Sequence, residues 1–165
     1  MLGKTSIAWL AVVLVLAACT VAPVVPAAPA STPVPPTATP APQPAAAAAT
    51  VMVTKNDALG SFLADAKGMT LYLFTKDTPN TSNCYDKCAT NWPPLIVTEK
   101  PVAGEEVDAA LLGTTTRKDG SLQVTYNGWP LYYWIKDVNP GDTTGQDVGG
   151  VWYVISPKGE EVESK

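Results

Sequence analysis

Two cysteines four positions apart offer the most definite chemistry in the sequence. Cys84 and Cys88 stand in a stretch where Ser82 or Asn83 would be the N-cap of a short helix. Residues four apart on a helix have Cα atoms about 6 Å apart, which is within the range of disulfides. An oxidising compartment then favours a bridge, and closing so short a ring would stabilise the fold by about 2 kcal/mol. We therefore predict a structural disulfide.

Two other uses of the cysteine pair stay open. A tight ring can be strained and more easily reduced, and a thiolate is stabilised at a helix N-terminus, so the pair would also suit redox chemistry. The spacing is not Cys-x-x-Cys, and no thioredoxin-like pattern surrounds it, which disfavours this use. Two thiolates would also suit a soft ion such as Cu(I), for which Met52 and Met69 are the nearby ligands by type.

Two aspartates follow aromatic runs at matching places. We expect the side chains of Asp77 and Asp137 to accept hydrogen bonds from backbone amides two residues on, which begins a turn. The loop after Asp137 also contains Asn139, Asp142 and Asp147, whose oxygens would suit Ca²⁺, but it lacks the spacing of an EF-hand and the closing Glu. We predict no metal site and no cofactor.

The composition argues against an enzyme and against a nucleic-acid partner. The chain contains no His, which excludes Ser-His-Asp catalysis, His-ligated zinc and the usual general base. No glycine-rich phosphate loop follows a strand, and no catalytic residue is predicted. The 15 acidic residues outnumber the 11 basic ones, which form no cluster.

An internal duplication organises the part of the chain beyond residue 50. Sliding this part against itself by 60 residues without a gap gives eight identities in 33 positions, where about two are expected by chance. The domain, residues 51–165, is therefore predicted to contain two related repeats, at about 55–97 and 115–157. The identities are Gly60 with Gly120, Ser61 with Ser121, Gly68 with Gly128, Leu71 with Leu131, Tyr72 with Tyr132, Lys76 with Lys136, Asp77 with Asp137 and Trp92 with Trp152.

Each repeat has the pattern of antiparallel β structure. The fold class predicted is a single small, mainly β domain of two duplicated repeats with one short Cys-containing helix. Asn127-Gly128 is the strongest hairpin signal, and Pro130 indicates an edge position or a bulge at the turn. The expected hairpins are 61–66 with 70–75, 122–126 with 131–135, and 113–117 with the strand from Leu122; further elements are strands at 51–54 and 151–155 and a helical turn at 108–112.

The two aromatic runs are apolar on both faces. Successive side chains of a strand point to opposite sides, so 71–74 and 131–134 should be covered on both sides. We expect the aromatic residues to form a packed core. The alternative is an exposed aromatic surface that receives a ligand or a partner chain.

The N-terminal 50 residues have the features of an export signal and a tether. Residues 1–18 hold an apolar run too short to span a bilayer, which is typical of a signal peptide. The segment Leu16-Ala17-Ala18-Cys19 resembles the lipobox of bacterial lipoproteins, in which the cysteine is acylated and becomes the mature N-terminus. Residues 19–50 are rich in Pro, Ala and Thr and are predicted to be a disordered tether that reaches up to about 95 Å.

Several motifs in the same order resemble a family of bacterial secreted-repeat lipoproteins with a Tyr-x-(Phe/Trp/Tyr)-x-x-Asp motif. The resemblance covers almost all of residues 55–160 and implies an exported, often lipid-anchored repeat domain of uncharacterised activity. The segments that carry it are 71–77, 88–95, 117–120, 126–132, 131–137 and 149–152, and the motif residues within them are Leu71, Tyr72, Phe74, Asp77, Trp92, Leu131, Tyr132, Trp134, Asp137 and Trp152.

These observations predict a non-enzymatic, exported β module anchored by Cys19 to the extracytoplasmic face of a membrane. Its role would be structural or would be to bind an envelope protein or polymer. The alternative function is an extracytoplasmic redox or electron-transfer accessory that uses Cys84 and Cys88.

Overall fold

The computed structural model describes residues 48–163. The predictions for residues 1–18, for Cys19 and for most of the tether lie outside the described residues. Within the described part, no helix has the length and apolar character needed to cross a membrane.

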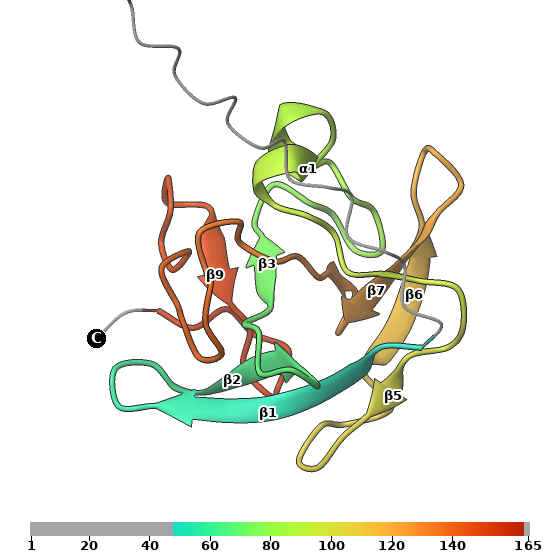
Figure 1. Ribbon diagram of the computed structural model, residues 1–165. Helices are drawn as coiled ribbons and strands as arrows, with labels where there is room; N and C mark the ends of the chain where they lie inside the picture. Colours follow the sequence, from blue (N-terminus) through green and yellow to red (C-terminus); the bar gives the residue numbers. More distant parts are fainter. Residues whose placement is uncertain (1–47, 164–165) are drawn as a thin grey trace, which may run out of the picture. The chain divides into compact units, whose positions relative to one another are not determined.

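The described chain folds into small sheets with one short helix, as the mainly β prediction requires (Figure 1). One sheet has the order β2-β1-β5, a second pairs β3 with β9, and a third has the order β4-β7-β6 with β8 also on β7. All pairs are antiparallel except β1 with β5. The elements are β1 (Thr50–Asn56), β2 (Gly60–Asp65), β3 (Tyr72–Phe74), α1 (Lys87–Asn91), β4 (Ile96–Val97), β5 (Val102–Ala103), β6 (Leu112–Thr116), β7 (Leu122–Tyr126), β8 (Trp129–Pro130) and β9 (Trp152–Val154).

The predicted duplication is visible in the pairing of strands. The β1–β2 hairpin aligns Val53 with Leu63, and the β6–β7 hairpin aligns Thr114 with Val124 in the same way. The two repeats meet where the main chains of Tyr72 and Tyr132 bond each other in both directions, with N···O distances of 2.9 and 3.0 Å. This reciprocal pair marks a local twofold relation between the repeats.

The gap-free spacing of 60 is wrong in the hairpin arms, where equivalent residues stand 61 apart: the Leu71 amide donates to the Leu63 carbonyl, and the Leu131 amide donates to the Val124 carbonyl. The cause is the length of the turn. Asp65 bonds back to Met69 across three residues, whereas Tyr126 pairs with Trp129 across Asn127-Gly128 alone. Consequently Gly60 and Gly120, although identical, are not structural equivalents.

The turn chemistry was predicted well. Asn127 and Gly128 have φ of 49° and 80°, as a two-residue hairpin turn with both central residues at positive φ requires. The pairing of β6 with β7 and the early and late strands, β1 and β9, are confirmed. Pro130 lies in the two-residue strand β8, which pairs only with β7.

The two long hairpins that would include the aromatic runs are only partly formed. From β2, a single bridge joins Ala64 to Thr70, after which β3 pairs with β9. The segment 131–135 is likewise bridged rather than a continuous strand. The reason is that both runs leave their hairpins to meet at the centre, where Tyr72 and Tyr132 bond each other.

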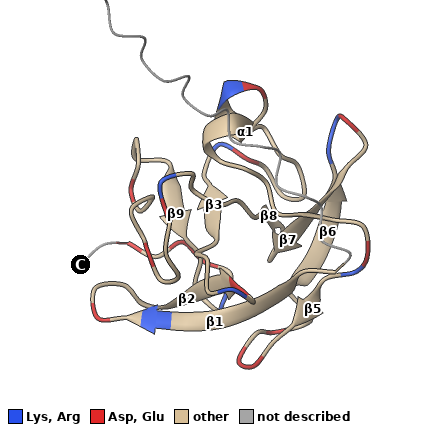
Figure 2. Cartoon of the chain, in the orientation of Figure 1, with Lys and Arg blue, Asp and Glu red and all other residues tan. Residues whose placement is uncertain are grey.

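The central runs separate two cores, so the expectation that they are covered on both faces is confirmed. One core contains the side chains of Leu71, Leu73, Leu131 and Tyr133. The other contains the intervening aromatic side chains, Tyr72, Phe74, Tyr132 and Trp134. Charged residues are concentrated in the loops and turns around these cores (Figure 2).

Helix α1 begins later than predicted. It starts at Lys87 with Asp86 as its N-cap, and no side chain caps it. Cys84 therefore precedes the helix, and only Cys88 lies on it. The helix does not begin at Ser82 or Asn83 because the Ser82 hydroxyl is engaged by Arg117 and Tyr132, and the Asn83 amide is engaged by Asp77.

Candidate functional site

The motif tyrosines and aspartates form a crossed pair of hydrogen bonds between the repeats. The Tyr72 hydroxyl donates to Asp137 Oδ2 at 2.5 Å, and the Tyr132 hydroxyl donates to Asp77 Oδ2 at 2.7 Å. Each tyrosine thus bonds the aspartate of the other repeat. We call these four residues the tyrosine–aspartate clasp.

The second oxygen of each clasp carboxylate holds the following loop. Asp77 Oδ1 accepts the Asn83 amide at 2.7 Å, and Asp137 Oδ1 accepts the Thr144 amide at 2.9 Å and its hydroxyl at 2.6 Å. The expectation that these side chains bond amides two residues on is therefore wrong. A carboxylate buried to this degree needs several donors, and the loop returns after six or seven residues to supply them.

Burial determines the protonation state of the clasp tyrosines. Tyr72 and Tyr132 are 0% exposed, and Asp77 is 5% exposed. Burial raises the pKa of each tyrosine well above its usual value, and a clasp aspartate raises it further in both cases. Burial also raises the pKa of Asp77, although the bonds from Tyr132 and Asn83 oppose the shift. The phenols therefore stay protonated and act as permanent donors.

Four aromatic side chains form a continuous stack beside the clasp. The order is Phe74, Trp152, Trp92, Trp134, and successive ring centroids are 4.2, 3.9 and 4.1 Å apart. The inner rings, Trp92 and Trp152, are buried, whereas the end rings are half-buried. Exchanging the repeats maps this aromatic stack onto itself.

The clasp tyrosines contact the inner rings of the stack edge-on. Tyr72 meets Trp92 at a centroid distance of 5.3 Å and an interplanar angle of 75°, and Tyr132 meets Trp152 at 5.2 Å and 87°. Such edge contacts add to the area burial of the rings. The structure thus places the matched aromatic residues in a core, in equivalent surroundings.

One end of the stack has an incomplete polar environment. Among the described residues, Trp134 Nε1 is the buried side-chain polar atom that lacks a hydrogen-bond partner. The Lys136 Nζ lies 5.5 Å from the centroid of the same ring.

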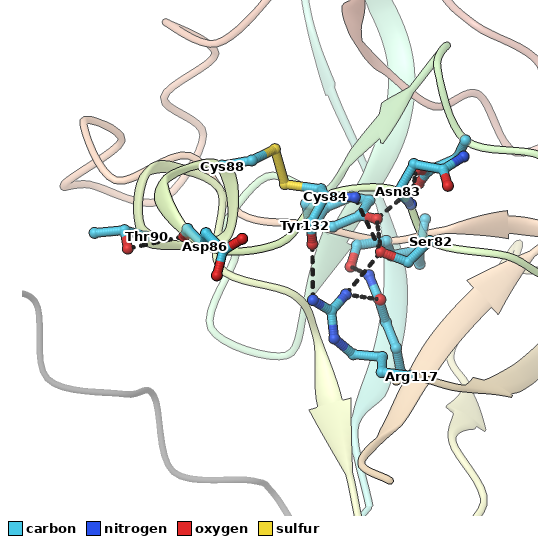
Figure 3. Close-up of a disulfide and its surroundings, with 11 residues drawn as sticks. Ser82, Asn83, Cys84, Asp86, Cys88, Thr90, Arg117 and Tyr132 are labelled. Carbon is cyan, nitrogen blue, oxygen red and sulfur yellow. Dashed lines mark hydrogen bonds between the residues drawn. A yellow bond between two sulfur atoms is a disulfide. The ribbon is translucent and has the colours of Figure 1, made fainter. Parts of the chain in front are cut away.

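Cys84 and Cys88 are joined in a disulfide, with their Cα atoms 5.2 Å apart (Figure 3). Arg117, whose side chain is 5% exposed, anchors the loop that precedes the disulfide. Its guanidinium donates to Ser82 Oγ at 2.8 Å and to the Cys84 carbonyl at 2.8 Å. These bonds explain the late start of α1, because they fix the chain from Ser82 to Cys84 in a non-helical path.

Arg117 also links the disulfide loop to the clasp. It donates to Gln123 Oε1 at 2.6 Å, and its positive charge lowers the pKa of Asp77 against the effect of burial. The Ser82 hydroxyl lies 2.7 Å from the Tyr132 hydroxyl. The family resemblance included residues 117–120, but sequence reasoning missed the role of Arg117, because a basic side chain at the end of a predicted strand is usually exposed.

The oxygens proposed for Ca²⁺ are used within the fold. Asp137 belongs to the clasp, and Asp142 Oδ2 accepts the amides of Val138 and Asn139 at 3.0 and 2.8 Å. Asp147 Oδ1 accepts the Tyr153 hydroxyl at 3.1 Å. In residues 48–163 no three His, Cys, Asp or Glu side chains gather where they could hold a metal ion.

A pocket of about 240 Å³ is lined by residues that include Ala48, Asp65, Lys67, Leu95 and Tyr133. Its carboxylate is already engaged. Asp65 Oδ1 accepts the Lys67 amide at 2.8 Å, and Asp65 Oδ2 accepts the Tyr133 hydroxyl at 3.1 Å.

A β domain whose two halves complete each other through matched side chains is a tandem-repeat protein. The model of a family described as a secreted repeat of unknown function matches residues 53–96 and 113–156, and the chain belongs to this family. The two matches coincide with the two halves of the fold. No curated protein and no solved structure matches the chain.

Proposed function

We propose that the protein is a non-enzymatic module of the cell envelope, anchored through Cys19 and carrying its folded domain on the segment up to residue 50. Its role is to bind a partner or to serve as a structural part of an exported assembly. The membrane is contacted through the lipid, and no nucleic acid and no cofactor is involved.

The clasp is the observation that carries this proposal. The clasp tyrosines and aspartates are the polar side chains of the motif that could take part in catalysis. They are buried, however, and they bond each other across the repeats. A group that acts on a substrate must reach it, and these groups are committed to joining the two halves. The motif therefore supports a stable scaffold whose surface meets the partner.

Membership of a secreted-repeat family supports the export part of the proposal. The anchor rests on Leu16-Ala17-Ala18-Cys19. Two or more acyl chains give stable attachment to a membrane, whereas one chain gives only marginal binding.

The anchor is tested by expressing the full chain and its Cys19→Ser variant in a bacterium that processes lipoproteins. We expect the parent chain in the membrane fraction, with a mature mass that shows cleavage before Cys19 and added acyl groups. The variant should lose both. A variant that stays membrane-bound with unchanged mass would refute the anchor.

A redox function makes a different prediction for the disulfide. A structural bridge should have a reduction potential below about −300 mV, whereas a potential near roughly −200 mV would favour an accessory that exchanges electrons. Replacing both cysteines by Ser should reduce stability alone. Loss of a cellular redox phenotype at unchanged protein level would overturn the non-enzymatic role.

A further inference from the structure

The two repeats differ in how the outer edge of their first hairpin is covered. In the first repeat, β5 lies on β1, and the two strands run parallel. In the second, β6 is the last strand of its sheet, and no described residue pairs with its outer edge. The repeat relation places β6 where β1 stands, so no described residue occupies the position of β5 in the second repeat.

The hydrogen bonds between β5 and β1 show which main-chain groups a strand beside β6 would bond. The Val102 amide donates to the Ala49 carbonyl, and the Gly104 amide donates to the Val51 carbonyl, both at 2.8 Å. With the spacing of 61 found in the hairpins, Val51 corresponds to Leu112, and the same spacing carried two residues back matches Ala49 to Ala110 in the turn just before β6.

Along β6, the amides and carbonyls of alternate residues point toward β7 and away from it. Asn127 donates its amide to the Leu111 carbonyl at 2.7 Å, and Arg117 donates its amide to the Ser121 carbonyl at 2.9 Å. These two bonds fix the odd-numbered residues as the ones that bond β7. The amides and carbonyls of Leu112 and Thr114 therefore face away from β7.

The path of the chain explains why this edge stays uncovered. After the first repeat the chain runs from β4 into β5 and reaches β1. After the second repeat it turns at 156–159 and returns to β9, where the Val162 amide donates to the Val154 carbonyl at 3.0 Å. Gln146 Nε2 holds the same residue by donating to the Val162 carbonyl at 2.6 Å.

Side chains at the open edge suit an added strand. Val51, beside β5, is fully buried, whereas Leu112 is half-buried. A Cβ on Gly104 would lie 3.1 Å from Met52 Cγ, and the residue that corresponds to Met52 on β6 is Gly113, which has no side chain to crowd a neighbour.

The open edge also lacks the usual protection against pairing. Natural edge strands are guarded by charged residues, proline or bulges. β6 has the sequence Leu-Gly-Thr-Thr-Thr, without a charge or a proline, whereas β1 carries Lys55 near its end (Figure 2).

We propose that β6 is a strand-addition site that takes an extended segment of a partner polypeptide, running parallel to β6, whose pairing residues are uncharged. The segment donates two alternate amides to the carbonyls of Ala110 and Leu112 and places a small apolar side chain beside Leu112. Main-chain bonds supply affinity in this mode of recognition, and alternate side chains supply specificity. The inference rests on the binding role proposed above and names the class of partner; it does not depend on the anchor at Cys19.

The test uses the mature full chain and a capped peptide with the sequence of residues 99–105, which includes β5. Amide hydrogen exchange is followed by NMR with and without peptide at millimolar concentration. We expect at least about tenfold slower exchange at Leu112 and Thr114, whose amides gain acceptors. The peptide leaves the protein sequence unchanged, so a failure to fold does not complicate the result.

Three methylated peptides serve as matched controls. N-methylation at the position of Val102 or of Gly104 removes a donor to the edge and should abolish the protection, whereas N-methylation at the position of Ala103, whose amide faces away, should preserve it.

Absence of protection, protection at β1 instead of β6, or protection unaffected by methylation would overturn the proposal. Protection of β6 that rises with protein concentration alone would identify a second copy as the occupant and would also overturn it. None of these outcomes bears on the Cys19 test.

Discussion

Tyr72, Phe74 and Trp92 of the first repeat have the same contacts as Tyr132, Trp134 and Trp152 of the second, whereas the loops that follow the two clasp aspartates are held in different ways. The ring stacking and the hydrogen bonds of the clasp join one repeat to the other, whereas the edge-on contact of each tyrosine lies within its own repeat. A single repeat has neither the aspartate that its tyrosine bonds nor half of the aromatic stack. The pair of repeats is therefore the unit that can fold.

The outward-facing loops show the opposite behaviour. The loop after Asp77 is closed by the disulfide and by bonds from Arg117. The loop after Asp137 is closed by close packing, since a Cβ on Gly145 would lie 2.8 Å from both the Tyr72 and Trp92 rings. Duplication has thus kept the interface between the repeats alike while the periphery has diverged, and the uncovered edge of β6 belongs to that diverged periphery.

The largest expected effect tests the equivalence of the inner rings. Trp92→Ala and Trp152→Ala should each lower the free energy of unfolding by about 3–5 kcal/mol, because each removes a buried ring from the middle of the stack. Urea denaturation followed by circular dichroism measures both. A difference of more than about 2 kcal/mol between the two variants would break the equivalence, since that is most of the spread expected for one substitution at different sites.

A smaller effect tests the two halves of the clasp. Tyr72→Phe and Tyr132→Phe each leave a buried carboxylate short of a donor and should cost about 2–3 kcal/mol of unfolding free energy. A double-mutant cycle of Tyr72→Phe with Asp137→Asn isolates the pair. The matched control combines Tyr72→Phe with Asp77→Asn, which are not bonded to each other. Equal coupling in both cycles would contradict the crossed arrangement.

The disulfide sharpens the contrast between the loops. Replacing Cys84 and Cys88 together by Ser should lower the free energy of unfolding by about 2 kcal/mol, through the lost constraint on the unfolded chain. Local opening of the disulfide loop should become easier as well, so amide exchange should accelerate most around α1, while the loop at Gly145 changes only by the global loss. Uniform acceleration in both repeats would show that the loops are not independent.

The sequence predicted those parts of the fold that local patterns determine. Asn127-Gly128 specifies its turn because both residues tolerate positive φ, and the continuous apolar runs 71–74 and 131–134 indicate segments that are covered on both faces. The pairing of β3 with β9 was missed because it joins residues about 80 positions apart, and the local sequence of a strand does not indicate which distant strand it pairs with.

The candidate site was predictable as a set of residues but not as an arrangement. The duplication singled out Tyr72, Asp77, Tyr132 and Asp137, yet nothing in one chain sequence distinguishes a bond within a repeat from a bond across repeats. Arg117 escaped notice because its burial depends on Ser82 and Gln123 folding around it, which is a tertiary fact. The start of α1 was misplaced for the same reason.

The smallest expected effect concerns pH and separates a clasp carboxylate of the first repeat from a surface carboxylate of the second. Burial raises the pKa of Asp77, so the folded state holds that proton more tightly than the unfolded state does. Its contribution to stability is complete below the usual Asp pKa of about 4 and is lost as pH rises through the raised value. Hydrogen bonds from Ser121 lower the pKa of Asp119, so its contribution has the opposite sign and is lost as pH falls through the lowered value.

Urea denaturation across the range from about pH 3 to pH 7 should show both signs. Asp77→Asn removes a group whose ionisation disfavours the fold, so the cost of this substitution should be smaller at neutral pH than below the usual Asp pKa. Asp119→Asn should cost more at neutral pH than in acid. Because Asp119 is exposed in a turn, its effect is the weaker of the two. Parallel pH profiles for the two variants would show that Asp77 is solvated like Asp119, and the clasp would then not be the buried junction that joins the repeats.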